Sequence, residues 1–299
     1  MFFYGDLDAY VAHIGDYVRE GLEADEAVLV ATVPSRVDAL LDHVGASTVR
    51  FVDLQHSLRN PGRLLPLWLD FVAEAAGQGR GARGVGEPLW EGRTPDEIVE
   101  CQHHEALLNL AFDSGPAWSL LCPYDVSALP EDVLREAMRS HPSVVVSDSR
   151  RASHGYLDSE RVPGLLAQPL GEPDGDIVHI AFDATNLGLL RERVVESART
   201  SAISAEQVDD LMLVVHELAS NSVRHGGGRG LARWWSDSCR FVVEVSDEGH
   251  LTDPLAGRTL PPPGAEGGRG LFLVHELSDL VELRTSPAGT VVRVQMAPR

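Results

Sequence analysis

Across residues 1–142, short apolar runs alternate with longer stretches in which apolar residues recur every three or four positions. This alternation restricts the possible folds more strongly than any other pattern in the chain. The short runs end at polar breaks, as buried strands do, and they are Ala27–Thr32, Val49–Asp53 and Trp118–Cys122. The periodic stretches predict helices over Leu64–Ala76 and Pro95–Phe112. Strands that alternate with helices predict an α/β fold with a parallel sheet.

The second of these helices has a clear start signal. Thr94 offers a hydroxyl as N-cap, Pro95 fits the first turn, and the acidic Asp96 and Glu97 follow. Acidic residues in the first turn complement the partial positive charge of a helix N-terminus. The pattern therefore predicts that the helix begins directly after Thr94.

The periodic pattern decays between residues 143 and 175. This segment is rich in Ser, Gly, Pro and charged residues, which is typical of a linker with some local order. We therefore expect two domains, over residues 1–142 and 176–299. The length of 299 residues agrees with that number, since domains have about 100–200 residues each.

The second domain shows a different order of elements. Its patterns predict a strand, two helices, a strand, a helix and a closing antiparallel pair of strands: Ile177–Phe182, Asn186–Thr200, Ala205–Arg224, Phe241–Ser246, Gly270–Leu277, Val281–Thr285 and Thr290–Met296. Helices that cover one face of an antiparallel or mixed sheet form an α+β sandwich. The expected fold class is thus an α/β domain followed by an α+β domain.

The basic residues exclude several classes of enzyme. All 25 are arginine, because the chain has no lysine. This excludes a P-loop NTPase of the GxxxxGK[ST] type, a lysine Schiff base and a protein-kinase fold with its phosphate-binding lysine. The net charge of −20 also argues against direct binding of nucleic acid, where neutralisation of phosphates supplies most of the affinity.

The cysteines and the apolar runs indicate the compartment. Cys101, Cys122 and Cys239 are odd in number and form no CxxC pair, which predicts neither a disulfide framework nor a zinc site. The first residues lack the basic segment and the long apolar core of a signal peptide. No apolar run approaches the length of about 20 residues that spans a bilayer. We therefore expect a cytoplasmic protein without a membrane segment.

The predicted helix Ala205–Arg224 has a core stripe and, beside it, one row of polar residues. The stripe recurs at a spacing of three or four and consists of Val208, Leu211, Val215, Leu218 and Ser222. Glu217, Asn221 and His225 are spaced four apart and so lie along one side of the helix. An Asn oxygen is a hard ligand for a divalent cation, and a Glu carboxylate can act as a base. Taken alone, a Glu and an Asn at this spacing are more often a solvated surface pair.

Two further motifs follow in order. Asp247-Glu248-Gly249 ends an apolar strand, where a carboxylate can accept a hydrogen bond from an exocyclic amine and a glycine lets a planar base approach the backbone. The Pro/Gly-rich segment 253–270 then leads into a helix. Glycines at a helix N-terminus leave backbone N–H groups for phosphate oxygens. Each motif by itself is common in turns and loops.

As an ordered set, ExxxN on a helix, DxG after a strand, GGRGL before a helix and GTVVRV in a final strand are much more specific. The set resembles the Bergerat-type ATP-binding domain shared by gyrase-type topoisomerases, heat-shock chaperones, histidine kinases and mismatch-repair proteins. HELASNSVRHG and GRGLFLVHELSDLVEL are similar in particular to the anti-sigma-factor serine-kinase branch of this superfamily. The resemblance covers residues 176–299 and implies an α/β-sandwich fold.

The resemblance implies eight site residues and the cofactors ATP and Mg²⁺. The implied roles are Glu217 as general base, Asn221 as Mg²⁺ ligand, Asp247 as partner of the adenine amino group, Gly249 as the place where the base approaches, Gly268 and Gly270 as phosphate-binding backbone with Arg269 beside them, and Thr290 as an adenine-side hydroxyl. The chain departs from many relatives at Leu251, where these have a second glycine.

The first domain has its own resemblance. RGVGEPLW (Arg83–Trp90), ExxLN (Glu105–Asn109), CPYD (Cys122–Asp125) and His141-Pro142 resemble the sensory domain of methanogen and methylotroph regulators, over residues 1–142. The resemblance implies a RecA-like α/β fold. A pocket for a small-molecule or protein signal is expected at the carboxyl ends of the parallel strands. In the alternative interpretation Glu87, Trp90, Cys122 and Tyr124 are core and turn residues.

Together these resemblances imply a cytoplasmic ATP-binding anti-sigma factor. It would phosphorylate a serine of an anti-sigma-factor antagonist under the control of the first domain, and it would form a homodimer. The implied partners are a sigma factor and the antagonist, with no nucleic acid and no membrane. The alternatives are a regulator that binds ATP without catalysis, a sensor-type histidine-kinase relative that acts by partner binding only, and a sensor whose nucleotide site is vestigial. Ser220 stands where an HExxH zinc helix beginning at His216 needs histidine, which excludes that motif.

Overall fold

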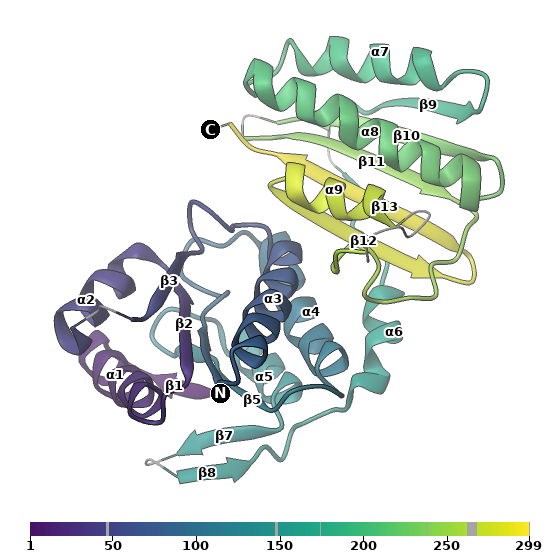
Figure 1. Ribbon diagram of the computed structural model, residues 1–299. Helices are drawn as coiled ribbons and strands as arrows, with labels where there is room; N and C mark the ends of the chain where they lie inside the picture. The colour runs from purple at the N-terminus through teal and green to yellow at the C-terminus, as the bar shows by residue number, and fades with distance from the viewer. Residues whose placement is uncertain (46–47, 147–148, 174, 238, 262–267, 299) are drawn as a thin grey trace. The chain divides into compact units, whose positions relative to one another are not determined.

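The computed structural model describes residues 1–45, 48–146, 149–173, 175–237, 239–261 and 268–298. The chain forms two units, Met1–Glu160 and Arg161–Arg299 (Figure 1). None of the helices in the described residues combines the length and the apolar character that a membrane crossing requires.

The first unit alternates strands and helices. In chain order its elements are β1 (Phe2–Tyr4), α1 (Leu7–Glu23), β2 (Ala27–Thr32), α2 (Pro34–Val44), β3 (Arg50–Asp53), the 3-10 turn η1 (Pro61–Arg63), α3 (Leu64–Gly77), β4 (Ala82–Gly86), α4 (Pro95–Ala111), β5 (Trp118–Leu121), β6 (Pro123–Asp125), α5 (Glu131–Ser140), β7 (Ser143–Val146) and β8 (Ser149–Ala152). Strands β3-β2-β4-β5 form a parallel sheet. In the set β6-β1-β7-β8, β1 pairs in parallel with both neighbours and β8 pairs antiparallel with β7.

The alternation of side chains along β2 explains how helices cover both faces of its sheet. Val28 and Val30 belong to a core cluster with residues of α1 and α2, whereas Leu29 and Ala31 belong to a cluster with residues of α3. Successive residues of a strand point to opposite faces, so an apolar strand without polar interruptions is buried on both sides. Figure 1 shows α1 and α2 on one side of these strands and α3 on the other.

A third core cluster joins α4 and α5 to β6. Its buried members include Cys101 of α4, Tyr124 of β6, Val133 and Ala137 of α5, and Cys122, which lies between β5 and β6. α4 begins at the predicted place. Thr94 and Glu97 form a full capping box, in which each side chain bonds the backbone of the other residue.

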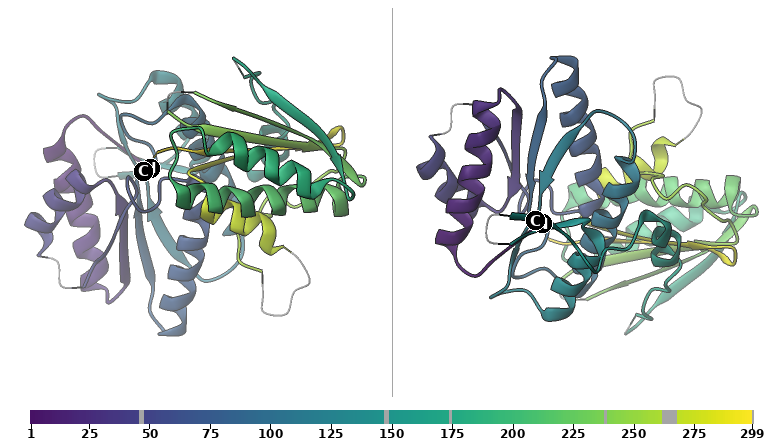
Figure 2. Two further views of the ribbon diagram at one scale, coloured as in Figure 1. Left: turned by 90° about the horizontal axis from the view of Figure 1, so that it is seen from above. Right: turned by 90° about the horizontal axis from the view of Figure 1, so that it is seen from below.

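The second unit is an antiparallel sheet with helices. Its elements are the 3-10 turn η2 at the boundary (Ser159–Arg161), α6 (Val162–Leu166), β9 (Val178–Asp183), α7 (Leu187–Ala198), α8 (Ala205–His225), β10 (Arg229–Ser236), β11 (Phe241–Asp247), α9 (Arg269–Leu277), β12 (Leu280–Ser286) and β13 (Gly289–Met296). The strand order is β12-β13-β11-β10-β9, and every neighbouring pair is antiparallel. Figure 2 shows α7 and α8 on one side of this sheet. One core cluster joins residues of these two helices and of α9 to the sheet.

The other face of this sheet carries charged residues that are nevertheless buried. Glu244 of β11 is 3% exposed and binds Arg233 of β10 and Arg293 of β13 at 2.6 and 2.7 Å. Residues of the segment before β9 bond the same arginines: Arg233 forms an ion pair with Glu172, and Arg293 donates to the carbonyl oxygen of Gly171. This segment therefore packs with the second unit.

The fold class agrees with the sequence prediction at the level of a mixed α/β unit and an antiparallel α+β unit. The strand predicted at Ala27–Thr32 has the same bounds as β2, and most other predicted elements agree within two residues. Part of the predicted linker 143–175 has regular structure. Residues 143–146 and 149–152 form β7 and β8 in the first unit, and Val162–Leu166 forms α6 in the second. Within the described residues, contacts divide the chain at Glu160, and the domain limits 142 and 176 stay predictions.

Candidate functional site

A cavity of about 500 Å³ in the second unit lies where α8, β11, α9 and β13 meet. Six of the eight predicted site residues line it: Asn221, Asp247, Gly249, Gly268, Gly270 and Thr290. Glu217 and Arg269 are not among the described residues of its wall. Small-molecule sites in proteins commonly have about 300–1,000 Å³, so the cavity has the size of a ligand pocket.

α8 presents the predicted polar row beside its buried stripe. The helix begins with a capping box between Ser204 and Gln207, which fixes its start. The predicted stripe is buried, and its members are Val208, Leu211, Val215, Leu218 and Ser222. Glu217 and Asn221 are half-buried and one turn apart, whereas His225 at the helix end is exposed. The row therefore runs along the border between core and cavity.

Asp247 is held in place by two neutral donors. Its Oδ2 accepts a hydrogen bond from Ser222 Oγ at 2.6 Å, and its Oδ1 accepts one from the backbone N–H of Gly249 at 2.8 Å. Each carboxylate oxygen has a second lone pair, so both can accept a further hydrogen bond from a ligand. The arrangement presents a fixed acceptor at the cavity wall.

Thr290 lies opposite Asp247 in the β11–β13 ladder, and both residues line the cavity. Its Oγ1 donates to the carbonyl oxygen of Gly249 at 2.8 Å and lies 2.8 Å from Thr285 Oγ1. Thr285 Oγ1 in turn accepts from the backbone N–H of Leu251 at 2.9 Å. These bonds fix the backbone that follows β11. Leu251 itself packs against the core cluster, which gives this departure from the glycine of many relatives a structural role.

The N-terminus of α9 lies against the polar row of α8. A Cβ atom at residue 270 would lie 2.5 Å from Glu217 Oε2 and 3.3 Å from Asn221 Nδ2, so a larger residue there would displace the end of the Glu217 side chain. Gly268 is the N-cap in a left-handed conformation with φ of +82°, and α9 has no side-chain cap bond in the described part of the chain. The first-turn N–H groups are therefore donors without an intrahelical partner. Arg269 is exposed beside them.

The Pro/Gly-rich segment 253–270 is described in part. Ala256, Gly257, Thr259 and Pro261 line the cavity, whereas residues 262–267 lie outside the described residues.

Sequence reasoning missed three residues of this site. Ser222 was assigned to the core stripe, although its hydroxyl holds Asp247. Thr285 supports Thr290 from the neighbouring strand, and its role depends on strand pairing that spacing does not show. Gly226 lies so close to Asp247 that a Cβ atom there would be 2.3 Å from Asp247 Cγ. The run Gly226-Gly227-Gly228 is the signal that could have indicated such a close approach.

In the first unit the carboxyl ends of β1, β2 and β4 carry a buried polar network. Glu87, which is 1% exposed, accepts hydrogen bonds from the hydroxyls of Tyr4 and Thr32. Arg36 lies 3.9 Å from the same carboxylate. Burial raises the pKa of Glu87, against the hydrogen bonds from Thr32 and Tyr4 and the charge of Arg36. These contacts favour the interpretation of Glu87 as a core residue.

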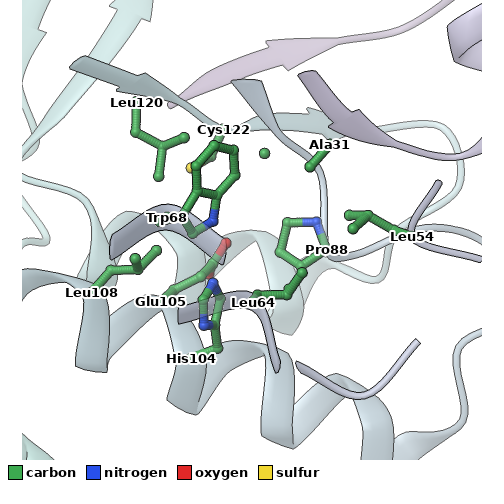
Figure 3. A pocket seen from close by; sticks show the side chains of 11 residues that line it. Ala31, Leu54, Leu64, Trp68, Pro88, His104, Glu105, Leu108, Leu120 and Cys122 are labelled. Atoms are coloured by element: carbon green, nitrogen blue, oxygen red, sulfur yellow. The ribbon is translucent and has the colours of Figure 1, made fainter. Parts of the chain in front are cut away.

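A small cavity beside this network is lined by residues of α3, α4 and β5 (Figure 3). It has about 10 Å³, which is the space of roughly one water molecule. Trp68 and Leu120 are among the side chains that line it. Trp90, the other aromatic residue in question, packs against Arg93, whose guanidinium carbon lies 3.6 Å from the centre of the Trp90 ring. The predicted signal pocket of the first unit stays a prediction.

Comparison with known proteins supplies two family matches. Residues 1–142 match the model of the MEthanogen/methylotroph, DcmR Sensory domain, called MEDS. Residues 180–296 match the model of the histidine kinase-like ATPase domain. Both matches agree with the resemblances described from the sequence motifs.

A comparison with curated proteins gives no match. Among solved structures, the chain is similar to the RsbU and RsbW domains of a Mycobacterium tuberculosis protein, with 14% identity and a TM-score of 0.32. The similarity covers 41% of this chain and 32% of the other chain.

Proposed function

We propose that this chain, in which a MEDS sensory domain precedes a histidine kinase-like ATPase domain, is an ATP-binding regulator of the anti-sigma-factor type. In this proposal the second domain binds Mg²⁺-ATP, captures a sigma factor and phosphorylates a serine of an antagonist protein. The first domain, with the proposed RecA-like fold, senses a small-molecule or protein signal and controls the second. The proposed domain limits are 1–142 and 176–299, and the proposed assembly is a homodimer.

The single observation that carries ATP binding is the cavity of about 500 Å³ with polar groups of two kinds at separate places of its wall. Asp247 offers a charged acceptor, which fits the amino group of adenine. The start of α9 offers backbone donors and the positive end of a helix dipole, which fit phosphate oxygens. A ligand with an amine-bearing base at one end and phosphates at the other matches both.

Mg²⁺ fits the donor set between these two places. Asn221 lines the cavity, and its side chain lies next to Gly270 at the start of α9. A carboxamide oxygen is an ordinary Mg²⁺ ligand when phosphates supply further oxygens. When bound there, the ion neutralises phosphate charge. Asn221 would hold it, and the N–H groups after Gly268 would orient the phosphates.

In the proposed transfer, Glu217 acts as general base. A serine hydroxyl of the antagonist forms the new O–P bond to the γ-phosphorus while the bond to the leaving ADP oxygen breaks. The hydroxyl proton passes to a Glu217 carboxylate oxygen. Positioning and charge neutralisation supply most of the catalysis in such reactions, and this chain would provide them through Asn221 and the α9 N-terminus.

One observation favours a second candidate function, an ATP-binding regulator without catalysis. Glu217 Oε2 faces the backbone of Gly270, and Glu217 is not among the described residues of the cavity wall. For this carboxylate to act on a serine hydroxyl, the Glu217 side chain or the α9 N-terminus would have to move. Without that movement ATP would set the shape of the domain for a partner and remain intact.

Calorimetric titration of the full chain with ATP, with and without Mg²⁺, tests the proposal. Asp247→Asn should weaken ATP binding about 10- to 100-fold, because a hydrogen bond to a charged acceptor contributes about 1.5–3 kcal/mol. Glu248→Gln is the matched control, since Glu248 is the exposed neighbour and pairs with Arg229 at 2.9 Å. Equal affinities of wild type and Asp247→Asn would remove Asp247 from the site. Absence of ATP binding by the wild type would refute the function itself.

The partners are tested by a pull-down from native lysate with and without ATP. The proposal expects a sigma factor among the proteins retained, with an amount that depends on ATP. Incubation of a captured antagonist with labelled ATP then distinguishes transfer to serine from binding alone.

A further inference from the structure

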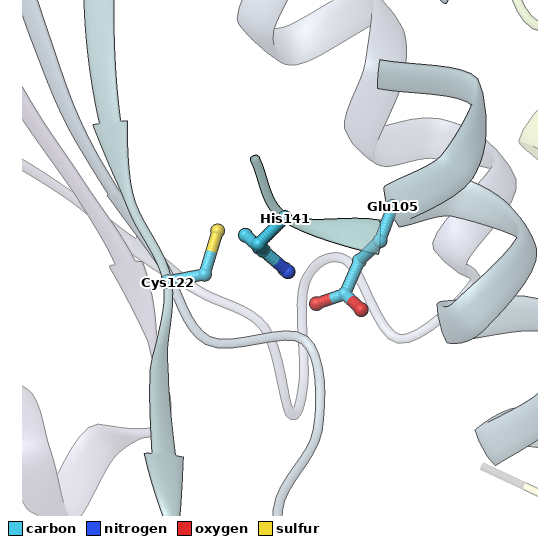
Figure 4. A group of neighbouring side chains, drawn as sticks. All are labelled: Glu105, Cys122 and His141. Atoms are coloured by element: carbon cyan, nitrogen blue, oxygen red, sulfur yellow. The ribbon is translucent and has the colours of Figure 1, made fainter. Parts of the chain in front are cut away.

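Three side chains with metal-binding atoms gather in the first unit, away from the nucleotide cavity. Glu105 of α4, Cys122 between β5 and β6, and His141 after α5 each offer one ligand atom, and these atoms lie within 4.8 Å of one another. Figure 4 shows the three side chains pointing toward one another from separate segments. Glu105 and Cys122 are 2% and 3% exposed, and His141 is half-buried. Such a mixed set of sulfur, nitrogen and oxygen differs from an acidic surface cluster.

The groups around the cluster orient two of its members as they do in metal sites. His141 Nδ1 lies 2.9 Å from the carbonyl oxygen of Ala137. In this geometry Nδ1–H is the donor, so the lone pair of the neutral ring is on Nε2. Metal-binding histidines almost always donate their other ring N–H to a carbonyl or carboxylate in this manner. The Tyr124 hydroxyl donates to Glu105 Oε1, which orients that carboxylate.

All three side chains also line one cavity of about 250 Å³. Its wall includes Asn109, whose amide donates to the carbonyl oxygens of Glu105 and Ser140 and so ties α4 to the end of α5. A metal ion held by three protein ligands keeps a position for water or another ligand. The cavity provides space for that position.

We propose that Glu105, Cys122 and His141 form a binding site for a zinc-class divalent cation, with its fourth position open to this cavity. Zn²⁺ accepts thiolate, imidazole and carboxylate ligands together. At metal–ligand distances of about 2.0–2.3 Å, tetrahedral ligand atoms are about 3.3–3.8 Å apart. The cluster therefore needs to contract by at most about 1.5 Å.

Charge and proton balance agree with this assignment. On binding, the Cys122 thiol releases its proton to the solvent, and the thiolate and the Glu105 carboxylate then carry two negative charges. A divalent cation neutralises both, whereas burial of such charges without a partner is costly. The positively charged groups among the described lining residues of the cavity are Arg150 and the N-terminal ammonium of Met1, which interacts with Cys122 and Glu105.

The site would connect three segments that are distant in sequence. Glu105 and His141 are separated in the chain by α5 and by two strands, β5 and β6, of different sheets, so an ion between them restrains the end of α5 against α4. A ligand that takes the fourth position would act on this junction. The inference does not depend on the nucleotide site, which uses residues of the other unit.

The test uses the full-length protein and zinc itself as the probe. Elemental analysis of protein purified without chelator should find one zinc ion per chain. After removal of zinc, addition of Co²⁺ should give the near-ultraviolet charge-transfer absorption of a thiolate–Co²⁺ bond. Cys122→Ser should abolish that absorption, and His141→Asn should reduce zinc affinity at least about 100-fold, because even outer-shell changes cost 10- to 100-fold.

Matched controls separate this site from other thiols and histidines. Cys101→Ser removes a buried thiol of the same core cluster, and Cys239→Ser removes the exposed one. His104→Asn removes the buried histidine next to Glu105. All three should keep zinc and the Co²⁺ band. Urea denaturation of each full-length variant, followed by far-ultraviolet circular dichroism, checks that the first unit is folded.

Two results would overturn the proposal. One is wild-type protein that neither retains zinc nor shows a thiolate–Co²⁺ band at stoichiometric metal. The other is zinc affinity that is equal in wild type, Cys122→Ser and His141→Asn. The wild-type Co²⁺ spectrum decides the matter even if a variant fails to fold.

Discussion

The two units each contain a carboxylate at a cavity, and the two carboxylates are held in different ways. Asp247 of the second unit is half-buried at the end of a strand and accepts hydrogen bonds from Ser222 and from Gly249, two residues further along. Glu105 of the first unit is 2% exposed on a helix and lies beside Cys122 and His141, which come from other segments.

This difference shows that a site built from short local motifs can be inferred from the sequence, whereas a site built from distant segments cannot. The surroundings of Asp247 are one helix, one strand end and one ladder partner, each with its own motif. The surroundings of Glu105 exist only when α4, α5 and the β5–β6 connection meet. Neutral donors around Asp247 suit repeated exchange of a ligand, whereas the mixed ligand set around Glu105 suits a retained ion.

The largest expected effect is on the unfolding free energy of the second unit when it is expressed without the first. A fragment of residues 161–299 should fold and bind ATP like the full chain, because its core cluster lies within the unit. A fragment of residues 176–299 should lose about 3–6 kcal/mol of unfolding free energy. It lacks the buried Val162 and Leu166, and burial of such a side chain contributes about 1.5–3 kcal/mol.

Urea denaturation of the two fragments measures that difference. Equal stability would mean that residues 161–175 contribute nothing to the free energy of unfolding, as expected of a linker. It would support the predicted domain limit at residue 176. An unfolded 161–299 fragment would mean that the second site depends on the first unit, which removes the contrast between the two sites.

The next effect separates binding from transfer. Glu217→Gln should leave ATP binding nearly unchanged and reduce phosphoryl transfer about 10²–10⁴-fold, the usual contribution of a general base. Asp209→Asn changes an exposed acid of the same helix and is the control. Transfer rates on the captured antagonist measure the effect. A variant as active as wild type would leave Glu217 with a structural role against Gly270 only.

A smaller effect tests whether neutral donors position Asp247. Ser222→Ala should weaken ATP binding about 2- to 10-fold, less than Asp247→Asn does, because the Ser222 hydroxyl positions the charged acceptor and does not itself bond the adenine amino group. Ser220→Ala removes a nearby hydroxyl of the same helix, which lies 3.5 Å from His216 Nδ1 instead. Calorimetry on both variants shows whether the hydroxyl of Ser222 matters specifically. Identical losses in the two would contradict the role of Ser222.

The smallest effect concerns a carboxylate of the first unit that is held by charge. Burial alone would raise the pKa of Glu97, but the hydrogen bond from Arg59, the charge of Arg93 and the backbone bond from Thr94 outweigh it. The folded-state pKa is therefore below the ordinary 4.5. The resulting stability is present above pH 4.5 and is lost as the pH falls through the folded-state value.

Glu97→Gln should flatten this acid dependence of the unfolding free energy and leave the dependence above pH 6 unchanged. Denaturation series between about pH 3 and pH 7 provide the measurement. Parallel curves for wild type and variant across the acid range would show that Arg59 and Arg93 do not stabilise the charged form.

Much of the fold could be predicted because local patterns determine it. The apolar run of β2 and the capping signal before α4 are short-range properties, and both have the predicted bounds at these places. β10 was not predicted. Its sequence contains Arg233, and a charged residue within a short segment is more typical of an exposed loop than of a buried strand. The strand forms because Arg233 pairs across the sheet with the buried Glu244, and only strand pairing brings them together.

The sequence alone determined the order of the nucleotide-site motifs, because Glu217 and Asn221 share a helix and Asp247 and Gly249 share a strand end. Their meeting at one cavity was a consequence of the sheet order, which sets Asp247 opposite Thr290. Spacing predicted no zinc site, since close pairs such as CxxC are what spacing can detect. Glu105, Cys122 and His141 are far apart in the chain, so only tertiary packing places them within ligand distance. Local periodicity determines which segments form helices and strands and which of their faces are buried. Contacts between distant segments depend instead on the free energy of the whole core.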